Sequence, residues 1–142
     1  MLSDMIRKVL ASRIALADND DFGIEAHWRQ EIDLFKQDMA ETIRFFEQDC
    51  TPEEFDWFSE IIADIADETQ SKPFVDCLFR YLLSHPECIT MPGVYEHCLY
   101  AEGNINDLSW ECSLKSQVEA MIAEKVCVKN GNNNVPMPKE EI

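Results

Sequence analysis

Histidine and cysteine side chains gather in one part of the sequence where they could bind a metal ion. The candidate ligands are His85, Cys88, His97 and Cys98. Structural zinc sites usually take such residues as well-spaced pairs, and the spacing H-x2-C-x8-H-C is irregular. His97 and Cys98 are also adjacent, so on a helix their side chains point in different directions. We therefore expect no metal ion and no other cofactor, with all 6 cysteines as free thiols.

Other motifs that carry out chemistry are weaker still. A Cys–His nucleophilic pair meets only in space, and few positive charges lie near the cysteines to lower a thiol pKa. The chain has 4 glycines and no cluster of them, which argues against a phosphate-binding loop. No D-x-D-x-D-G run is present to bind calcium. None of these motifs therefore indicates an enzyme, although a Cys–His pair is not recognisable from sequence alone, and a Cys/His metal-dependent enzyme or regulator is the less favoured alternative.

The segment from Thr51 to Gln70, TPEEFDWFSEIIADIADETQ, gives a different signal, because it is apolar on one side and acidic on the other. It begins like a helix, with Pro52 at the first helical position and Thr51 and Glu54 as a capping box. At about 100° per residue its apolar residues fall on one arc of a single helix. The opposite arc holds Glu53, Asp56, Trp57, Glu60, Asp64, Asp67 and Glu68.

This acidic arc has no basic partner in its own segment. Acids stand at positions 47, 49, 53, 54, 56, 60, 64, 67 and 68, and no Lys or Arg lies among them. Like charges three or four residues apart destabilise a helix by about 0.2–0.5 kcal/mol per pair, and ordinary solvated faces relieve this repulsion with basic residues. Trp57 lies within the arc, away from the apolar side, so we expect it to be exposed as a contact residue. We interpret the arc as a partner-binding surface, and a merely solvated face is the alternative.

The charge of the chain limits what that partner is. Its 142 residues include 12 Lys and Arg against 28 Asp and Glu, a net charge of −16. Phosphates and anionic membranes would be repelled, so we expect a cationic partner and neither nucleic acid nor a membrane. No apolar run approaches the ~20 residues of a membrane span. Charges at Asp4, Arg7 and Arg13 interrupt the region where a signal peptide would be apolar, so we expect a cytoplasmic protein with reduced cysteines.

The remaining sequence is dominated by helical periodicity. The longest apolar stripe runs from Ile24 to Phe46 and predicts one helix of roughly six turns. Further helices are predicted around 2–14, 74–82, 94–99 and 109–126, with Asn130-Gly131 as the stop of the last one. The sequence thus predicts an all-α, single-domain bundle of five or six helices over residues 1–129, followed by a polar, proline-broken tail over 130–142. The expected core includes Trp28, Phe35, Phe58, Ile62, Leu78 and Leu114.

Residues 51–87 also resemble part of a known group of proteins. The pattern P-E-E-F-x-W-x-S-E, then E-T-Q-S-K, and the spacing to His85-Pro86-Glu87 are similar to a segment of small, helical bacterial immunity proteins. Those proteins are cytoplasmic antidotes to toxins of contact-dependent growth inhibition and related polymorphic toxin systems. The resemblance covers about a quarter of the chain. It implies binding to one cognate toxin, often a nuclease, without enzymatic activity, and it supplies no catalytic residues.

Charge and resemblance lead to one functional expectation. We expect an immunity protein that binds and neutralises a cognate, basic nuclease toxin through its acidic helix. A nuclease must present Lys and Arg to phosphates, and an acidic surface competes for the same groups. Blocking the active site and occluding a neighbouring surface would serve equally well. An acidic adaptor that binds a cationic protein in an unrelated assembly remains the alternative with the same chemistry.

Overall fold

The computed structural model describes residues 2–16 and 20–133. Within these residues the chain is helical and contains no strand, which confirms the predicted all-α class. The α-helices in this described part of the chain number eight, so the expected count of five or six is wrong. They are α1 (Leu2–Ile14), α2 (Asp21–Lys36), α3 (Met39–Arg44), α4 (Pro52–Phe58), α5 (Ile62–Thr69), α6 (Lys72–Ser84), α7 (Val94–Gly103) and α8 (Lys115–Asn133). None of the helices described is both long and apolar enough to cross a membrane.

Two irregular turns connect some of these helices. A π-helical turn, η1 (Phe45–Asp49), continues α3 directly, and a 3₁₀ turn, η2 (Pro86–Thr90), follows α6. In η1 the N–H of Cys50 donates to the carbonyl of Phe45 at 2.9 Å, a wider loop than that of an α-helix. Pro86 begins η2, because a proline cannot extend the preceding helix.

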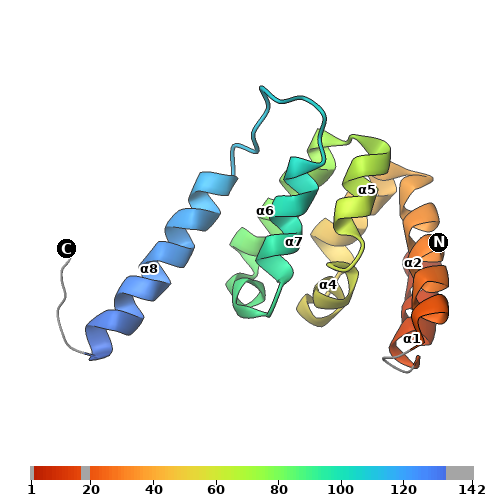
Figure 1. The fold of residues 1–142 in the computed structure, drawn as a ribbon, viewed down its shortest axis with the longest axis horizontal. Coiled ribbons are helices and arrows are strands. Elements are labelled where there is room, and N and C mark those ends of the chain that lie inside the picture. The colour runs from red at the N-terminus through yellow and green to blue at the C-terminus, as the bar shows by residue number, and fades with distance from the viewer. Residues whose placement is uncertain (1, 17–19, 134–142) are drawn as a thin grey trace.

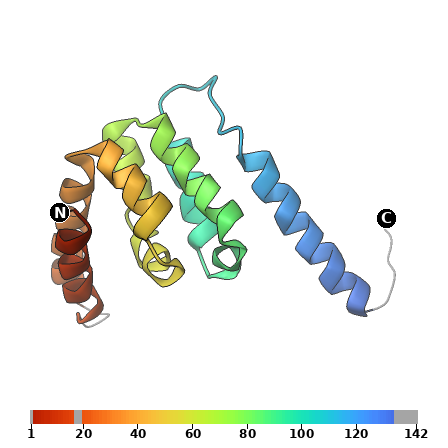
Figure 2. The ribbon, with the colours of Figure 1, turned by 180° about the vertical axis from the view of Figure 1, so that it is seen from behind.

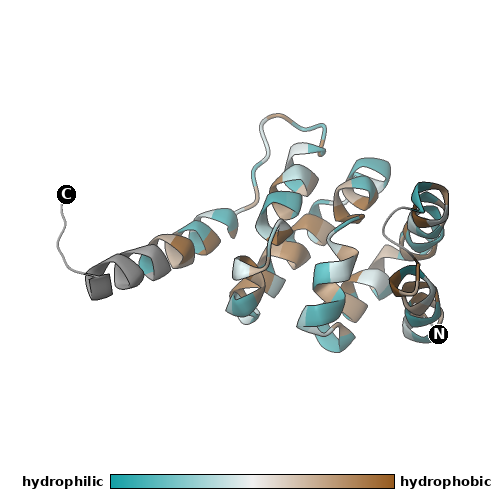
Figure 3. Cartoon of the chain, turned by 60° about the horizontal axis from the view of Figure 1, so that its bottom comes forward, coloured by the Kyte–Doolittle hydropathy of each residue, from teal (hydrophilic) through white to brown (hydrophobic). Residues whose placement is uncertain are grey.

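The helices are arranged in two layers (Figures 1 and 2). In one layer α2, α5 and α7 lie side by side, and α1, α3 with η1, and α6 form the other. α1 and α2 form an antiparallel pair, as do α6 and α7, and α4 lies against η2 at the lower edge of Figure 1. Hydrophobic residues lie mainly between the helices and hydrophilic residues on their outer faces (Figure 3). Burial between the layers therefore supplies the core.

An aromatic cluster joins the two layers. Phe35 of α2 lies 5.2 Å from Phe58 of α4 and 5.3 Å from Phe46 of η1, measured between ring centroids. Phe46 in turn contacts Phe55 of α4 and Phe74 of α6. All of these rings are fully buried. Because aromatic pairs at such separations contribute about 0.5–1.5 kcal/mol each beyond their burial, the cluster fixes α2, η1, α4 and α6 against one another.

Most of the predicted core residues are fully buried: Phe35, Phe58, Ile62 and Leu78. Trp28 and Leu114 are the exceptions, since each is half-buried and packs at the edge of the core. The indole N–H of Trp28 donates to the carboxylate of Glu60, which is itself half-buried, so the ring lies at the edge of the core and is not enclosed. Leu114 lies just before α8, where the chain leaves the two layers.

The predicted single helix from Ile24 to Phe46 is wrong, because the chain bends at Gln37 and Asp38 between α2 and α3. Asp38 has extended geometry, with φ at −148°, and its carboxylate accepts the N–H of Glu41 at 3.1 Å. Such a cap satisfies an N–H group that has no partner within the helix, and so favours a new helix start. The apolar spacing continues across the bend, so the hydrophobic pattern did not reveal it.

The last helix also differs from its prediction. α8 begins at Lys115 instead of Ser109, and it continues through Asn130-Gly131 to Asn133. Val118 is buried against the rest of the molecule and Ile122 is half-buried, while the far end of α8 extends away from the two layers (Figures 1 and 2). The predicted polar tail lies outside the described residues from position 134 onward.

Candidate protein-interaction surface

The acidic segment predicted as one helix consists of two helices, α4 and α5, separated by a turn at residues 59–61. Its start is as predicted, because Thr51 accepts the N–H of Glu54 at 3.2 Å and the Glu54 carboxylate accepts the N–H of Thr51 at 3.0 Å. At the turn, the Ser59 hydroxyl donates to the Asp56 carbonyl at 2.6 Å and the N–H of Ile61 donates to Phe58 at 2.9 Å. The predicted contact residues therefore do not share one face of one helix.

Glu60, in the turn between α4 and α5, is bound by residues of α1 and α2. Its carboxylate accepts from Arg13 at 2.6 and 3.1 Å and from the indole N–H of Trp28 at 2.9 Å. Arg13 is only 7% exposed, so this pair lies partly inside the protein. Charge-assisted bonds of this kind are among the stronger hydrogen bonds in proteins. Glu60 therefore fastens the turn to the neighbouring helices.

Glu68, near the end of α5, also forms ion pairs with the neighbouring helix α2. It accepts from Arg29 at 2.7 Å and from Lys36 at 3.0 Å, both on α2. These hydrogen bonds, first from Arg29 and then from Lys36, lower the pKa of Glu68 to about 2. The expectation that the acidic arc lacks basic partners is thus wrong for Glu60 and Glu68, because their partners lie more than thirty residues away in the sequence.

Trp57 is half-buried and not freely exposed as expected. The guanidinium of Arg13 lies 5.1 Å from its ring, and the ring packs against the edge of the core. Part of the ring lines an open hollow between α1 and α4 together with Leu10, Ile14 and Glu53. A cation over an aromatic face is held by the charge distribution of the ring. Trp57 therefore has a packing role and also contributes to the surface beside α4.

The other predicted contact acids are exposed, and none forms an ion pair within residues 2–16 and 20–133. They are Glu53 and Asp56 on α4 and Asp64 and Asp67 on α5. Partial burial raises the pKa of Asp64, and the nearby charges of Glu68 and Asp67 raise it further. The neighbouring carboxylates of α5 thus add to the effect of burial in disfavouring the charged form of Asp64. We refer to these four residues as the acidic surface.

Most basic residues whose side chains are described are, by contrast, already engaged, and Lys8 is the exception. Every Lys and Arg from Arg13 to Lys115 forms an ion pair with a carboxylate. Several of these pairs connect different elements, as Arg80 does with Glu47 of η1 and Lys115 with Glu102 of α7. Since the bases are neutralised in this way, the excess of negative charge remains on exposed acids. A negative surface of this kind attracts cationic partners over long distances.

The cysteines of the candidate metal site do not form a reactive cluster. Cys88 and Cys98 are fully buried, and burial raises the pKa of both thiols, that of Cys88 to about 11. Thiols with such pKa values are poor nucleophiles near neutral pH. In the described part of the chain no three His, Cys, Asp or Glu residues are grouped to hold a metal ion. The other free, buried cysteines are Cys50, Cys77 and Cys112, and the side chain of Cys127 lies outside the described residues.

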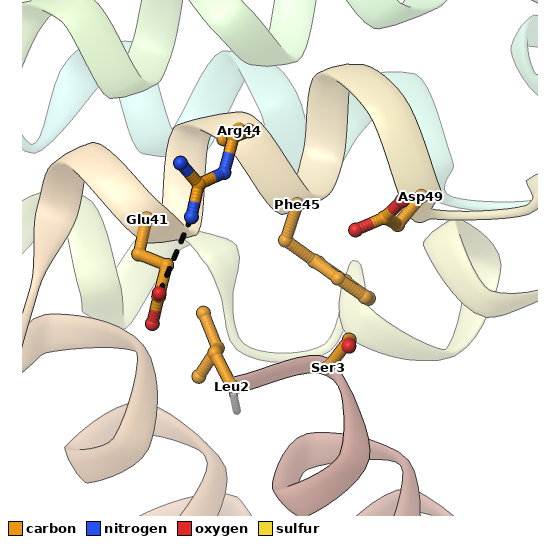
Figure 4. A pocket seen from close by; sticks show the side chains of 6 residues that line it. All are labelled: Leu2, Ser3, Glu41, Arg44, Phe45 and Asp49. Atoms are coloured by element: carbon orange, nitrogen blue, oxygen red, sulfur yellow. Dashed lines mark hydrogen bonds and ion pairs between the residues drawn. The ribbon is translucent and has the colours of Figure 1, made fainter.

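A second hollow lies where the start of α1 meets α3 and η1 (Figure 4). Leu2 and Phe45 supply its apolar part, and Ser3, Glu41, Arg44 and Asp49 its polar part. Arg44 donates to Glu41 at 3.3 Å, so the positive charge of the hollow is already neutralised. We assign no binding role to it.

Comparisons of the chain with protein-family models, curated proteins and solved structures each found no match. The function is therefore inferred from the charge and geometry described above. The exposed apolar residue that sequence reasoning missed most clearly is Leu108, in the loop between α7 and α8, which is 99% exposed. A single leucine among polar residues gives no periodic signal, so its exposure was not evident from the sequence.

Proposed function

We propose that this chain is an immunity protein that binds one cognate toxin domain with a basic surface, such as a nuclease, and neutralises it without catalysing a reaction. The observation that carries the proposal is the unequal use of charge. The basic residues from Arg13 to Lys115 are paired within the fold, whereas Glu53, Asp56, Asp64 and Asp67 face solvent without an ion pair in the described residues.

The acidic surface suits a competitor for a nucleic-acid site. A nuclease must place Lys and Arg where phosphates bind, and carboxylates on a folded protein offer the same groups an alternative partner. Opposite charge also accelerates the encounter of the two proteins, which matters when a toxin has to be captured before it acts. Binding over the active site and binding beside it both exploit this attraction.

The acids of α4 and α5 divide between two roles in this proposal. Glu60 and Glu68 bind Arg13, Arg29 and Lys36, so they hold the two helices in position. The acidic surface itself has no such partners among the described residues and is available to the toxin. The buried thiols, whose pKa values are raised, support a binding role over a cysteine-dependent reaction.

The test is a toxin challenge. The product of the neighbouring gene, which the proposal identifies as the toxin, is expressed in a host cell together with wild-type chain or with a variant. One variant neutralises the acidic surface (Glu53→Gln, Asp56→Asn, Asp64→Asn and Asp67→Asn). The matched control neutralises exposed acids elsewhere (Asp4→Asn, Glu25→Gln, Glu96→Gln and Glu124→Gln). Each set changes the net charge by +4, from −16 to −12.

We expect the wild-type chain and the control to protect the cell and the acidic-surface variant to lose protection. The variants must be compared at equal expression level, because loss of protein would imitate loss of binding. A wild-type chain that neither protects the cell nor binds the toxin domain overturns the proposal in favour of an acidic adaptor. Equal protection by both variants would show that the toxin is bound elsewhere on the molecule.

A further inference from the structure

The loop between α7 and α8, residues 104–114, lies at the top of Figure 1. Side-chain hydrogen bonds bind it to α5 and to Gln70 at the end of that helix. Gln70, which has left-handed backbone geometry with φ at 52°, donates to the carbonyl of Asn104 at 2.9 Å and accepts the N–H of Asn106 at 2.7 Å. Asn104 in turn donates to the carbonyl of Ala63 at 2.8 Å. The first part of the loop is therefore fixed to the helix that carries half of the acidic surface.

The next part of the loop is fixed to the start of α6. Asp107 binds Lys72 at 2.8 Å and also accepts the N–H and the hydroxyl of Ser109 at 3.1 and 2.6 Å. The ammonium group of Lys72 lies 5.9 Å from the ring of Trp110. The residues on both sides of Leu108 are thus held in place by contacts of their own.

Leu108 is the exposed apolar point of this ordered loop. Its side chain is 99% exposed, whereas Ile105 and Cys112 of the same loop are buried. Tyr100, whose carbonyl accepts the N–H of Asn104 one turn before the loop, is 60% exposed. An apolar side chain on a fixed backbone loses little conformational freedom when a partner covers it, so more of its burial contributes to affinity.

Exposed acids lie on α5, the helix to which Gln70 and Asn104 bind this loop. Asp67 is one helical turn after Ala63 on the same side of α5, and its carbonyl accepts from Gln70 at 2.9 Å. Asp64 is the neighbour of Asp67 at three residues along the helix, and both are exposed. An apolar centre with a charged rim is the usual anatomy of a protein interface.

We propose that Leu108 is the apolar anchor of a protein interface whose charged rim is formed by Asp64 and Asp67. The occupant is a cationic protein domain that presents an apolar pocket flanked by Lys or Arg. A second copy of this chain fits less well, because a net charge of −16 makes two copies repel each other. The inference rests on the proposed function, since it names the part of the surface that the toxin domain contacts.

The test measures binding kinetics between the purified chain of residues 1–142 and the product of the neighbouring gene, which the proposed function identifies as the toxin. The variant Leu108→Ser removes the anchor. The control Phe22→Ser removes another strongly exposed apolar side chain, 89% exposed, from the start of α2 at the opposite edge of the molecule (Figure 1). A third variant, Asp64→Asn with Asp67→Asn, removes the charged rim. Neither Leu108 nor Phe22 is packed in the core, so the melting temperatures should stay equal.

We expect Leu108→Ser to weaken binding about tenfold or more, mainly through faster dissociation, and Phe22→Ser to leave it unchanged. The rim variant should mainly slow association, and the slowing should diminish at high salt. Wild-type binding that Leu108→Ser does not weaken overturns this inference and leaves the proposed function standing. No binding by the wild-type chain overturns both. A wild-type dimer that Leu108→Ser dissociates would assign the anchor to a second copy and contradict the cationic occupant.

Discussion

The most unusual single residue is Glu31, on α2. It is 1% exposed, and neither of its carboxylate oxygens has a hydrogen-bond partner within the described residues. Burial raises its pKa from 4.5 to about 8, and the negative charge of Glu60 adds to this effect while Arg13 opposes it. A buried acid without a partner is held mainly in its neutral form near pH 7. Glu31 therefore couples the stability of the fold to pH.

The direction of this coupling follows from the two pKa values. Because the pKa of Glu31 is higher in the folded state, the free energy of unfolding is fully retained below pH 4.5, where Glu31 is neutral in both states. It falls progressively as the pH rises from 4.5 through about 8, because ionisation then favours the unfolded state. The loss at pH 7 amounts to ~3 kcal/mol. Glu31→Gln, which cannot ionise, should stabilise the protein by roughly that amount at pH 7 and by little at pH 4.5. Urea unfolding of both proteins across this range measures it, and a pH-independent difference would contradict it.

Sequence reasoning at the scale of single residues was right where burial alone decides the outcome and wrong where a distant partner does. Phe58 and Ile62 are buried as their helical spacing predicts. Glu60 had the same spacing signal as the exposed acids, but its partner Arg13 is 47 residues away in the sequence. No pattern within the segment could distinguish a carboxylate that binds arginine from one that faces solvent.

At the scale of elements, local capping was predictable and helix interruptions were not. The Thr51–Glu54 capping box depends on residues three apart, and the sequence revealed it. The turn at residues 59–61 is hidden, because Phe58, Ile61 and Ile65 are all buried and keep a helix-like spacing across it. Hydrophobic spacing records which residues face the core, and both a helix and a short turn satisfy it.

The α4–α5 turn depends on its ion pair with α1, which gives a prediction at this scale. Glu60→Ala leaves Arg13 almost buried without its carboxylate and removes the acceptor of the Trp28 indole. We expect this change to destabilise the protein by about 2–4 kcal/mol. Glu53→Ala, on the exposed side of α4, should cost less than ~0.5 kcal/mol. Denaturant unfolding of the two variants distinguishes the structural acid from the surface acid, and equal effects would contradict the division of roles.

At the scale of the whole molecule, the structure accounts for how so acidic a chain folds. The chain has 12 basic and 28 acidic residues, and each base from Arg13 to Lys115 binds a carboxylate, often between elements. Composition predicted the negative net charge, whereas only the arrangement of helices reveals which acids remain exposed.

Neutralising the acidic surface removes repulsion between like charges and breaks no ion pair in the described residues. The melting temperature of the acidic-surface variant should therefore equal or exceed that of the wild type, and a lower value measured by thermal unfolding would contradict this.

The central claim, that the acidic surface captures a basic toxin, is tested most directly by the association rate with the toxin domain at increasing salt. Screening lengths fall from about 10 Å at 0.1 M salt to about 3 Å at 1 M, so electrostatic attraction should largely vanish over this range. We predict a fast wild-type rate that falls steeply with salt, a similar rate for the matched control, and a slower, flatter rate for the acidic-surface variant. A variant rate equal to that of the control at every salt concentration would contradict the account.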